Sequence, residues 1–327
     1  MKVLILAGGA GTRLYPLSTE ECPKQFLKLA DNKSLLVNTV ERFLSLCRPS
    51  DIVVITNQRY KDITQQELAD NNLQEVSIVT EPAKKNTAPA IVLGVRNCID
   101  KLDADKDEPI IIAPSDHVIR PVKSFEASVN DMQLIIKNDK IATLGVVPTR
   151  PDTGYGYIRV ADREANISDA EKFYEKPDSK TAEQYIKSGD YYWNAGIYGF
   201  SYNVLISELK KHAPELAKLL ARPVDTILSD YPSLTGISID YAVSEKSKNI
   251  AVAKMQAEWS DIGGFEALYE LSPKDKNGNA VIGNVKYENC KNCLLIAETE
   301  FAAYDLSDYI AIQNGCSALI KKNGDKN

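Results

Sequence analysis

The sequence opens with Lys2-Val-Leu-Ile-Leu-Ala7 and runs on through Leu6-Ala-Gly-Gly-Ala-Gly-Thr-Arg-Leu-Tyr-Pro-Leu-Ser18. A short apolar run bounded by turn residues is typical of a buried strand. Apolar residues with helical spacing begin again near Ser34. The stretch between them is therefore expected to be a long glycine-rich loop that leaves the carboxyl end of the first strand.

The composition of this loop suits an anionic ligand. Gly8, Gly9 and Gly11 lack a Cβ atom, so their backbone N–H groups can approach a ligand closely and converge on it. Arg13 and Lys24 add two positive charges; arginine suits bidentate contact with phosphate, whereas lysine acts as a point charge. The loop predicts a polyphosphate site, with a flexible glycine turn as the alternative.

Two common phosphate-binding motifs are excluded. No Gly-Lys-Ser/Thr occurs in the chain, so it has no P-loop. A dinucleotide fingerprint counted from Gly9 and Gly11 would need its last glycine where Leu14 stands.

The bulk composition limits the class of protein. A chain of 327 residues suits one large domain with an appendage, or two domains. Its 44% hydrophobic and 26% charged residues are typical of soluble globular proteins, and a net charge of −6 argues against a general nucleic-acid binder. No stretch approaches the ~18 apolar residues of a membrane helix, and the first apolar run is too short for a signal peptide. We expect a cytoplasmic protein with no membrane partner.

The cysteines and histidines do not indicate a zinc site. Cys290 and Cys293 form one C-x-x-C pair, but no second pair completes a set of four ligands. The only histidines are His117 and His212, which argues against a zinc enzyme or a histidine-based triad. The six cysteines are expected to be reduced thiols.

Strand and helix patterns alternate along the chain. Strands are expected over 51–56, 76–80, 109–114 and 140–146, and helices from 34, over 60–70 and over 125–137. This alternation predicts a doubly wound α/β fold with a mostly parallel sheet. Ligands of such sheets bind beyond the carboxyl ends of the strands, so the loops that follow strands are where the chemistry is expected.

Two of these loops carry candidate residues. In the loop after residues 76–80, Thr87 is expected to cap a helix and Pro89 to lie in its first turn, which leaves Glu81 and Asn86 unexplained. Asp116 follows the strand over 109–114 and is placed to hold a hard cation, or else to cap the next segment.

Later segments leave alternatives open. Gly154 and Gly156 are typical of a tight turn that opens a hairpin. Glu175 and Lys176 either bind a sugar phosphate or form an ordinary surface pair. Asp240 either caps a helix or faces a sugar. From residue 272 onward, short apolar strands replace the long helices.

The motifs resemble those of the sugar-1-phosphate nucleotidyltransferases. They are LAGGAGTRLYPLS at 6–18, PKQFL at 23–27, the E-P-x-x-x-N-T-A-P-A segment at 81–90, TGYGYI at 153–158, EKP at 175–177, WNAG at 193–196, SIDYAV at 238–243 and DIG at 261–263. They occur in the family's order over nearly the whole chain, and PKQFL is most similar to the mannose-1-phosphate guanylyltransferases. One departure is Gly264-Phe265, where members usually carry Ser-Trp; it leaves Asp261 in place and puts only local packing in doubt.

This resemblance implies a fold, an activity and a set of partners. The fold would be of the nucleotide-diphospho-sugar transferase type, with a catalytic domain over 1–271 and a C-terminal β module over 272–327, often a left-handed β-helix used in self-association. The activity would be Mg²⁺-dependent transfer of GMP from GTP to mannose-1-phosphate, by a homodimer. Alternatives are another pair of sugar-1-phosphate and nucleotide, or a non-catalytic regulatory subunit that binds nucleotide sugars.

The resemblance also implies roles for individual residues. Catalysis would fall to Arg13, Lys24, Asp116 and Asp261, of which Asp116 and Asp261 would hold Mg²⁺. The nucleotide would be bound by Leu6, Gly8, Gly9, Gly11, Thr12, Glu81, Asn86 and Thr87. The sugar phosphate would be bound by Gly156, Glu175, Lys176, Asn194 and Asp240. Nothing in the sequence itself brings Asp116 and Asp261 together.

Overall fold

A computed structural model of the chain describes residues 1–9, 11–29 and 32–324. The chain forms two compact units. Unit 1 comprises Met1–Gly8, Thr39–Ser115 and Ile119–Trp259, and unit 2 comprises Gly9–Asn38, Asp116–Val118 and Ser260–Asn327. Most of the glycine-rich loop thus belongs with the C-terminal part of the chain. The predicted assignment of separate roles to residues 1–271 and 272–327 stays a prediction.

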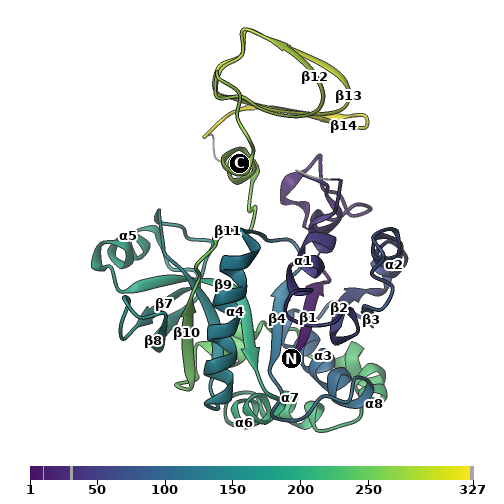
Figure 1. Cartoon of the computed structure of the whole chain (residues 1–327), viewed down its shortest axis with the longest axis vertical. Helices are drawn as coiled ribbons and strands as arrows, with labels where there is room; N and C mark the ends of the chain where they lie inside the picture. Colours follow the sequence, from purple (N-terminus) through teal and green to yellow (C-terminus); the bar gives the residue numbers. More distant parts are fainter. Residues whose placement is uncertain (10, 30–31, 325–327) are drawn as a thin grey trace. The chain divides into compact units, whose positions relative to one another are not determined.

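Unit 1 is built on a nine-stranded sheet with the order β3-β2-β1-β4-β9-β6-β10-β8-β7 (Figure 1). Its strands are β1 (Lys2–Ala7), β2 (Ile52–Asn57), β3 (Ser77–Glu81), β4 (Ile110–Pro114), β6 (Ile141–Val146), β7 (Tyr157–Val160), β8 (Ile167–Tyr174), β9 (Tyr191–Phe200) and β10 (Ile250–Lys254). Strands β3, β2, β1 and β4 are parallel, as are β6 and β10, whereas β9 runs antiparallel to β4 and β6, and β7 and β8 form a hairpin. The α/β fold is confirmed, but the sheet is mixed: its parallel pairing is interrupted by β9 and by the β7–β8 hairpin, whose strand β8 runs antiparallel to β10. Two short strands, β5 (Val118–Arg120) and β11 (Glu258–Ser260), lie outside this sheet.

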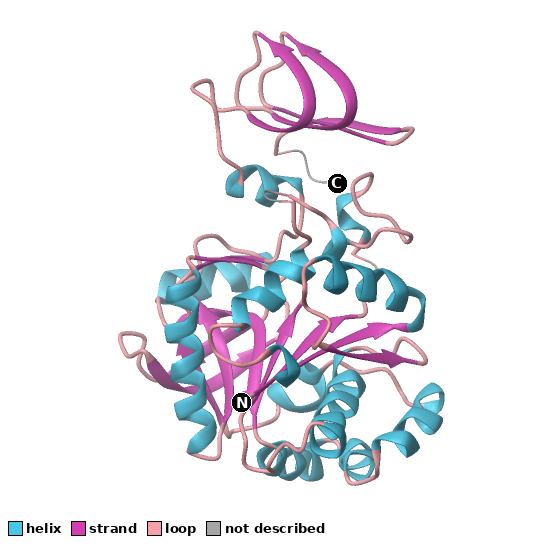
Figure 2. Cartoon of the chain, turned by 45° about the vertical axis from the view of Figure 1, so that its right-hand side comes forward, coloured by secondary structure: helices cyan, strands magenta, loops and turns pink. Residues whose placement is uncertain are grey.

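Helices lie on both sides of this sheet (Figure 2). The helices of the chain are α1 (Leu35–Phe43), α2 (Lys61–Asp70), α3 (Thr87–Lys101), α4 (Val122–Lys137), α5 (Ser179–Ser188), α6 (Tyr202–His212), α7 (Pro214–Leu220), α8 (Val224–Asp230) and α9 (Phe265–Leu271). On β4, Ile110 and Ile112 pack in one core cluster with α3 and with α6 to α8. Ile111 lies on the opposite face, where a Cβ added to Gly199 would be 2.9 Å from it and 2.8 Å from Ile136 of α4. Burial on both faces is why the parallel strands are continuous apolar runs rather than alternating ones.

The C-terminal strands form a coil of chain within unit 2. They are β12 (Ala280–Glu288), β13 (Leu294–Tyr304), β14 (Tyr309–Asn314) and β15 (Ser317–Lys322); the first three pair in parallel, and β15 is antiparallel to β14. Figure 1 shows β12 and β13 side by side through the same curve. The corners repeat after 16 residues: Asn289 donates a hydrogen bond to Asp305, and Asn292 donates one to Asp308, each at 3.1 Å. The predicted β module is confirmed, while its handedness and its use in self-association stay predictions.

The two cysteines of the C-x-x-C pair belong to the core of this coil. Both side chains are buried, and their Sγ atoms lie 3.5 Å from backbone carbonyls of the next turn, Cys290 from Ala303 and Cys293 from Leu306. All six cysteines lie in the described residues and carry free thiols. The C-x-x-C pair is therefore accounted for by packing in the core of the coil. Among the described helices, none is long and apolar enough to cross a membrane.

The core of unit 2 joins the loop that follows β1 to the C-terminal segment. Leu14 of the loop and Leu35 pack in one buried cluster with Phe265 of α9 and with Leu294 and Ile310 of the coil. The departure at position 265 is therefore explained, since the phenylalanine ring fills this core and is 1% exposed. The packing of Leu14 into this core holds the loop in place. The polar side chains of the loop are therefore positioned without a regular strand or a long helix.

Candidate functional site

Unit 2 brings three of the four predicted catalytic residues together. Lys24 begins a short 3₁₀ helix (Lys24–Phe26) directly after Pro23, and its side chain is 7% exposed. Its Nζ donates a hydrogen bond to Oδ2 of Asp116 at 2.8 Å and another to the backbone carbonyl of Asp261. Residues that are 92 and 237 positions away from Lys24 in the sequence therefore meet at one ammonium group.

The charge state of this group follows from its contacts. Burial, the largest single effect, favours the neutral form of Asp116, but the charge and hydrogen bond of Lys24 together with His117 outweigh burial and hold the pKa of the carboxyl below its ordinary value. Asp116 is thus ionised at neutral pH. Its side chain remains 30% exposed, so a carboxylate oxygen is still accessible for a further ligand.

A hydrogen bond between its own side chain and backbone fixes the turn that carries Asp261. Oδ1 of Asp261 accepts a hydrogen bond from the N–H of Gly263 at 3.1 Å, and Ile262 adopts φ 44°. Among the described residues, no group of three or more His, Cys, Asp or Glu could hold a metal ion. Two carboxylates nevertheless suit Mg²⁺, which binds oxygen ligands and usually takes only one or two from the protein, the rest coming from water and substrate phosphates. The residues present fit that ion.

The glycine-rich loop is shaped around Lys24. Gly11 has φ +55°, and a Cβ there would lie 2.6 Å from the Cβ of Lys24, so this position requires glycine. Gly9 faces open space, with no atom within 4 Å of an added Cβ. Thr12 and Arg13 are exposed in the next 3₁₀ turn (Thr12–Leu14). Both are available to a ligand, and their predicted contacts stay predictions.

Glu81 lies at the carboxyl end of β3 with its side chain buried. The hydroxyl of the fully buried Tyr231 donates a hydrogen bond to Oε1. A Cβ on Gly8 would lie 2.6 Å from Oε2, so the two predicted nucleotide residues are neighbours in unit 1. Burial raises the pKa of the Glu81 carboxyl, and the Tyr231 hydrogen bond opposes this shift. Sequence reasoning missed Tyr231, which lies 150 positions away and belongs to no motif.

The cap of α3 corrects one prediction. Asn86, not Thr87, is the N-cap residue: its Oδ1 accepts a hydrogen bond from the Thr87 N–H at 2.8 Å, and its backbone has φ 68°. Asparagine tolerates this left-handed region better than a β-branched residue does, which explains why the cap falls one residue earlier. Thr87 starts the helix, and its Oγ1 accepts a hydrogen bond from the Ile239 N–H at 2.9 Å. Pro89 lies in the first turn, as expected.

Asn194 and Asp240 meet in a partly buried network. The Asn194 side-chain amide of β9 lies 3.2 Å from Oδ1 of Asp240, and the hydroxyl of Tyr198 donates to the same oxygen at 2.7 Å. Asp240 is the first residue of the one-turn π-helix (Asp240–Ser244), and the hydroxyl of Ser238, not the Asp240 carboxylate, accepts a hydrogen bond from the Tyr241 N–H at 3.3 Å, so of the two alternatives for Asp240 the helix cap is excluded. Burial raises the pKa of Tyr198 well above its ordinary value, so its hydroxyl stays a donor at neutral pH. Tyr198 is a second residue that the sequence motifs did not single out.

Glu175, Lys176 and Gly156 form a third group in unit 1. The Glu175 side chain is 8% exposed, and Lys176 Nζ donates to its Oε1. A Cβ on Gly156 would lie 2.7 Å from Oε2 of Glu175. Burial raises the pKa of the Glu175 carboxyl, while the Lys176 hydrogen bond lowers it. Lys176 has φ 48° and its side chain is 54% exposed, so its ammonium is accessible, and the two alternatives of a sugar-phosphate site and a surface pair both stay open.

The remaining predicted nucleotide residue is Leu6, which lies in β1 with its carbonyl bonded to the Ser115 N–H at 3.1 Å. Each unit thus contains its own set of predicted site residues. Unit 2 holds Lys24 with Asp116 and Asp261, and unit 1 holds Glu81 with Gly8, Asn194 with Asp240, and Glu175 with Gly156. The roles of all these residues stay predictions.

Known proteins are similar to this chain in sequence and in fold. The nucleotidyl transferase family matches residues 2–278. A mannose-1-phosphate guanylyltransferase of Escherichia coli is 35% identical, covering 98% of this chain and 72% of the relative. The mannose-1-phosphate guanylyltransferase RfbM of Salmonella typhimurium is 36% identical, covering 98% and 69%.

Solved structures agree with the sequence relatives. A crystal structure named as a mannose-1-phosphate geranyltransferase from Thermus thermophilus aligns with a TM-score of 0.89 at 30% identity, covering 98% of this chain and 95% of that one. A UDP-glucose pyrophosphorylase at 17% identity, with a TM-score of 0.52 over 82% of this chain and 96% of that one, shares the fold alone. The chain therefore belongs to the nucleotidyl transferase family, and over nearly its whole length it is similar to relatives named mannose-1-phosphate guanylyltransferases.

Proposed function

We propose that the chain transfers GMP from GTP to mannose-1-phosphate, with GDP-mannose and pyrophosphate as products. The names of the most similar relatives support this choice of substrates. The observation that carries it is the contact of Lys24 with Asp116 and with the carbonyl of Asp261. One cation and two acidic residues, supplied by three separate segments of the chain, form the kind of group that a reaction between phosphates requires.

The reaction is a single displacement at phosphorus. An oxygen of the sugar phosphate attacks the α-phosphorus of GTP in line, the bond to the β-phosphate breaks, and pyrophosphate leaves with the electron pair. No covalent protein intermediate is needed, because positioning and neutralisation of charge account for catalysis of such a step. Lys24, Arg13 and the amides of the glycine-rich loop would stabilise the departing pyrophosphate.

The proposal includes Mg²⁺ held by Asp116 and Asp261. The ion would supply neutralisation of phosphate charge and polarisation at the reacting phosphorus. The ionised state of Asp116 and its partly exposed carboxylate support this assignment. Lys24 would keep Asp116 ionised whether or not the ion is present.

The residues of unit 1 would bind the rest of the two substrates. Glu81, Asn86 and Thr87 would contact the base and ribose, since Glu81 carries a buried carboxylate that can accept hydrogen bonds. Asn194, Asp240 and Glu175 would bind sugar hydroxyls, and the exposed ammonium of Lys176 would bind the sugar phosphate. We further propose a cytoplasmic homodimer; a monomer at micromolar concentration in light scattering would reject the dimer.

The test is pyrophosphate release with Mg²⁺, crossing GTP, UTP, dTTP and ATP against mannose-1-phosphate and glucose-1-phosphate. We expect turnover with GTP and mannose-1-phosphate. Turnover only with another pair would overturn the substrates and keep the mechanism. Silence throughout, from a folded protein that binds nucleotide, would favour a non-catalytic regulatory subunit.

A pair of variants tests the assigned roles. Asp261→Asn should lower kcat by about 10²-fold or more, the scale of losing one electrostatic group in an active site. Asp103→Asn is the matched control, because Asp103 is exposed, lies outside the candidate groups and has φ 49°, which asparagine also accepts. Equal turnover of the two variants would refute the role of Asp261.

A further inference from the structure

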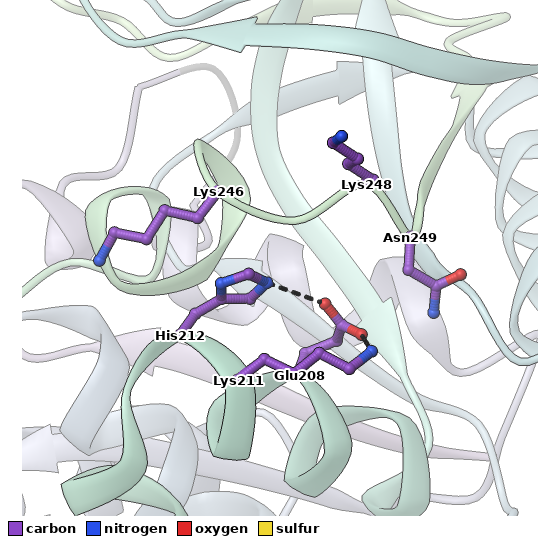
Figure 3. A pocket seen from close by; sticks show the side chains of 6 residues that line it. All are labelled: Glu208, Lys211, His212, Lys246, Lys248 and Asn249. Carbon is purple, nitrogen blue, oxygen red and sulfur yellow. Dashed lines mark hydrogen bonds and ion pairs between the residues drawn. The ribbon is translucent and has the colours of Figure 1, made fainter.

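A pocket of ≈ 520 Å³ lies in unit 1 outside the groups described above. It is lined by Glu208, Lys211 and His212 of α6 and by Lys246, Lys248 and Asn249 of the segment before β10 (Figure 3). Strand β10 starts at Ile250, so the pocket lies at the amino end of that strand. The candidate residues for catalysis follow the carboxyl ends of strands, so this pocket is a separate feature of the fold.

A buried carboxylate holds the two sides of the pocket together. The side chain of Glu208 is 2% exposed and accepts hydrogen bonds from Lys211 Nζ at 2.6 Å and from Ser247 Oγ at 2.7 Å. Nε2 of His212 lies 3.5 Å from Oε2 of Glu208, the oxygen that Ser247 also contacts, and Figure 3 shows Lys211 and His212 directed toward Glu208. Because Ser247 belongs to the segment before β10, Glu208 fixes that segment to α6. The pocket is built by the fold and does not depend on the position of a free loop.

The charges of the pocket are not balanced. Glu208 compensates Lys211, but Lys246 and Lys248 are exposed and neither forms an ion pair with any residue that the structure describes. Two positive charges therefore remain in a chain whose net charge is −6. Lysine side chains within one small pocket repel one another, so a bound anion would relieve a cost that the free protein carries.

We propose that this pocket binds a compact polyanion that carries phosphate groups. Two lysines supply point charges, and Asn249 and His212 supply polar groups for hydrogen bonds. Phe, Tyr and Trp are absent from the lining residues, and the one aromatic ring, that of His212, is held beside Glu208, so the pocket offers little surface for stacking a base. Recognition would therefore act on the phosphates themselves. The volume lies within the range of small-molecule sites.

The test is isothermal titration calorimetry of the whole chain with pyrophosphate in the absence of Mg²⁺ and in the presence of saturating GDP-mannose, so that the site proposed for the reaction is already occupied and the binding event reports on the pocket. The Lys246→Gln/Lys248→Gln variant removes the two unpaired charges, and we expect its Kd for this binding event to rise about tenfold, since charge-assisted hydrogen bonds to phosphate are lost. The control is Lys123→Gln/Lys137→Gln, which removes the same charge from two exposed lysines of α4 and should retain wild-type affinity. A parallel titration with glycerol-3-phosphate distinguishes a free polyphosphate from the phosphate of an organic ester as the ligand.

Either of two results would overturn the proposal. One is unchanged pyrophosphate binding in the pocket variant. The other is an equal loss of affinity in the control variant, which would show that the effect comes from the net charge of the protein and not from the pocket. Since both lysines are exposed and unpaired, the variant should keep the wild-type circular dichroism spectrum and thermal midpoint, and the titration is then read on folded protein.

Discussion

The contact between Lys24 and Asp116 leads to a quantitative prediction. Lys24→Met keeps the length of a buried side chain but leaves the Asp116 carboxylate without its cation. A hydrogen bond to a charged group contributes about 1.5–3 kcal/mol, and an unpaired carboxylate in a partly buried place adds a desolvation cost. Because Asp116 is 30% exposed, we expect the free energy of unfolding to fall by about 3 kcal/mol at pH 7.

A double-mutant cycle separates the pair from its surroundings. Asp116→Asn should cost about 1.5 kcal/mol, and the double variant about 3 rather than the additive 4.5 kcal/mol, because the unpaired charge is then gone. The coupling energy is therefore about 1.5 kcal/mol. A chain of two units need not unfold in one step, so the assay is hydrogen exchange of peptides that cover 24–26 and 261–263.

The pH dependence has a definite sign. In the wild type the pKa of Asp116 lies below its unfolded value of about 3.9, so its contribution to stability is complete above that pH and is lost as the pH falls through the folded pKa. In Lys24→Met burial is opposed only by His117 and a backbone hydrogen bond, so the folded pKa of Asp116 should rise and the penalty should shrink as the carboxyl takes up a proton. The two proteins should therefore differ most near pH 7 and least near pH 4. A difference that does not change with pH, or a coupling below about 0.5 kcal/mol, would refute the reasoning.

Three further predictions concern other parts of the fold. Asn86→Ala should lower the free energy of unfolding by about 2 kcal/mol, from a lost helix cap and a left-handed backbone, whereas Asn86→Gly should lose only the cap; equal losses in urea unfolding would contradict this. Tyr231→Phe should raise the pKa of Glu81 further, so its destabilisation should be larger at pH 7 than at pH 4 in thermal melts, and a loss that grows on acidification would reject the hydrogen bond as its cause. Gly283→Ala places a Cβ 2.0 Å from a backbone oxygen at φ +83°, so the C-terminal coil should lose protection from hydrogen exchange while peptides of β1 keep theirs.

Local patterns were sufficient to predict the elements that carry the site. Lys2–Ala7 is a buried strand, and the helix expected over 60–70 begins at Lys61, because apolar periodicity reflects burial directly. The loops after β3 and β4 carry Glu81 and Asp116 for the same reason. Thr87 was placed wrongly as a cap, since the choice between neighbouring polar residues depends on a backbone angle that composition does not reveal.

Contacts over long sequence separations could not be predicted. Tyr231 and Tyr198 hold Glu81 and Asp240, yet each is an ordinary buried tyrosine in its own segment. The grouping of Gly9–Asn38 with Ser260–Asn327 depends on a shared core, which no local pattern encodes. Only the family resemblance implied that Asp116 and the turn at Asp261 lie close together. The structure supplies the physical reason, because the ammonium group of Lys24 contacts both.

The stacked corners of the C-terminal coil restrict how its length can change. Asn289 and Asp305, like Asn292 and Asp308, lie one above the other with left-handed backbones, and each turn of the coil contacts only its neighbours. Strand β13 already contains an irregularity of this kind: its register with β12 shifts between Gly283, which faces Ala297, and Val285, which faces Phe301, so β13 holds two more residues than β12 there. Adding a whole turn of 16 residues would keep every corner over another corner. The coil can therefore take up two residues in a bulge between its corners, whereas a longer insertion that keeps the corners stacked should be a whole turn.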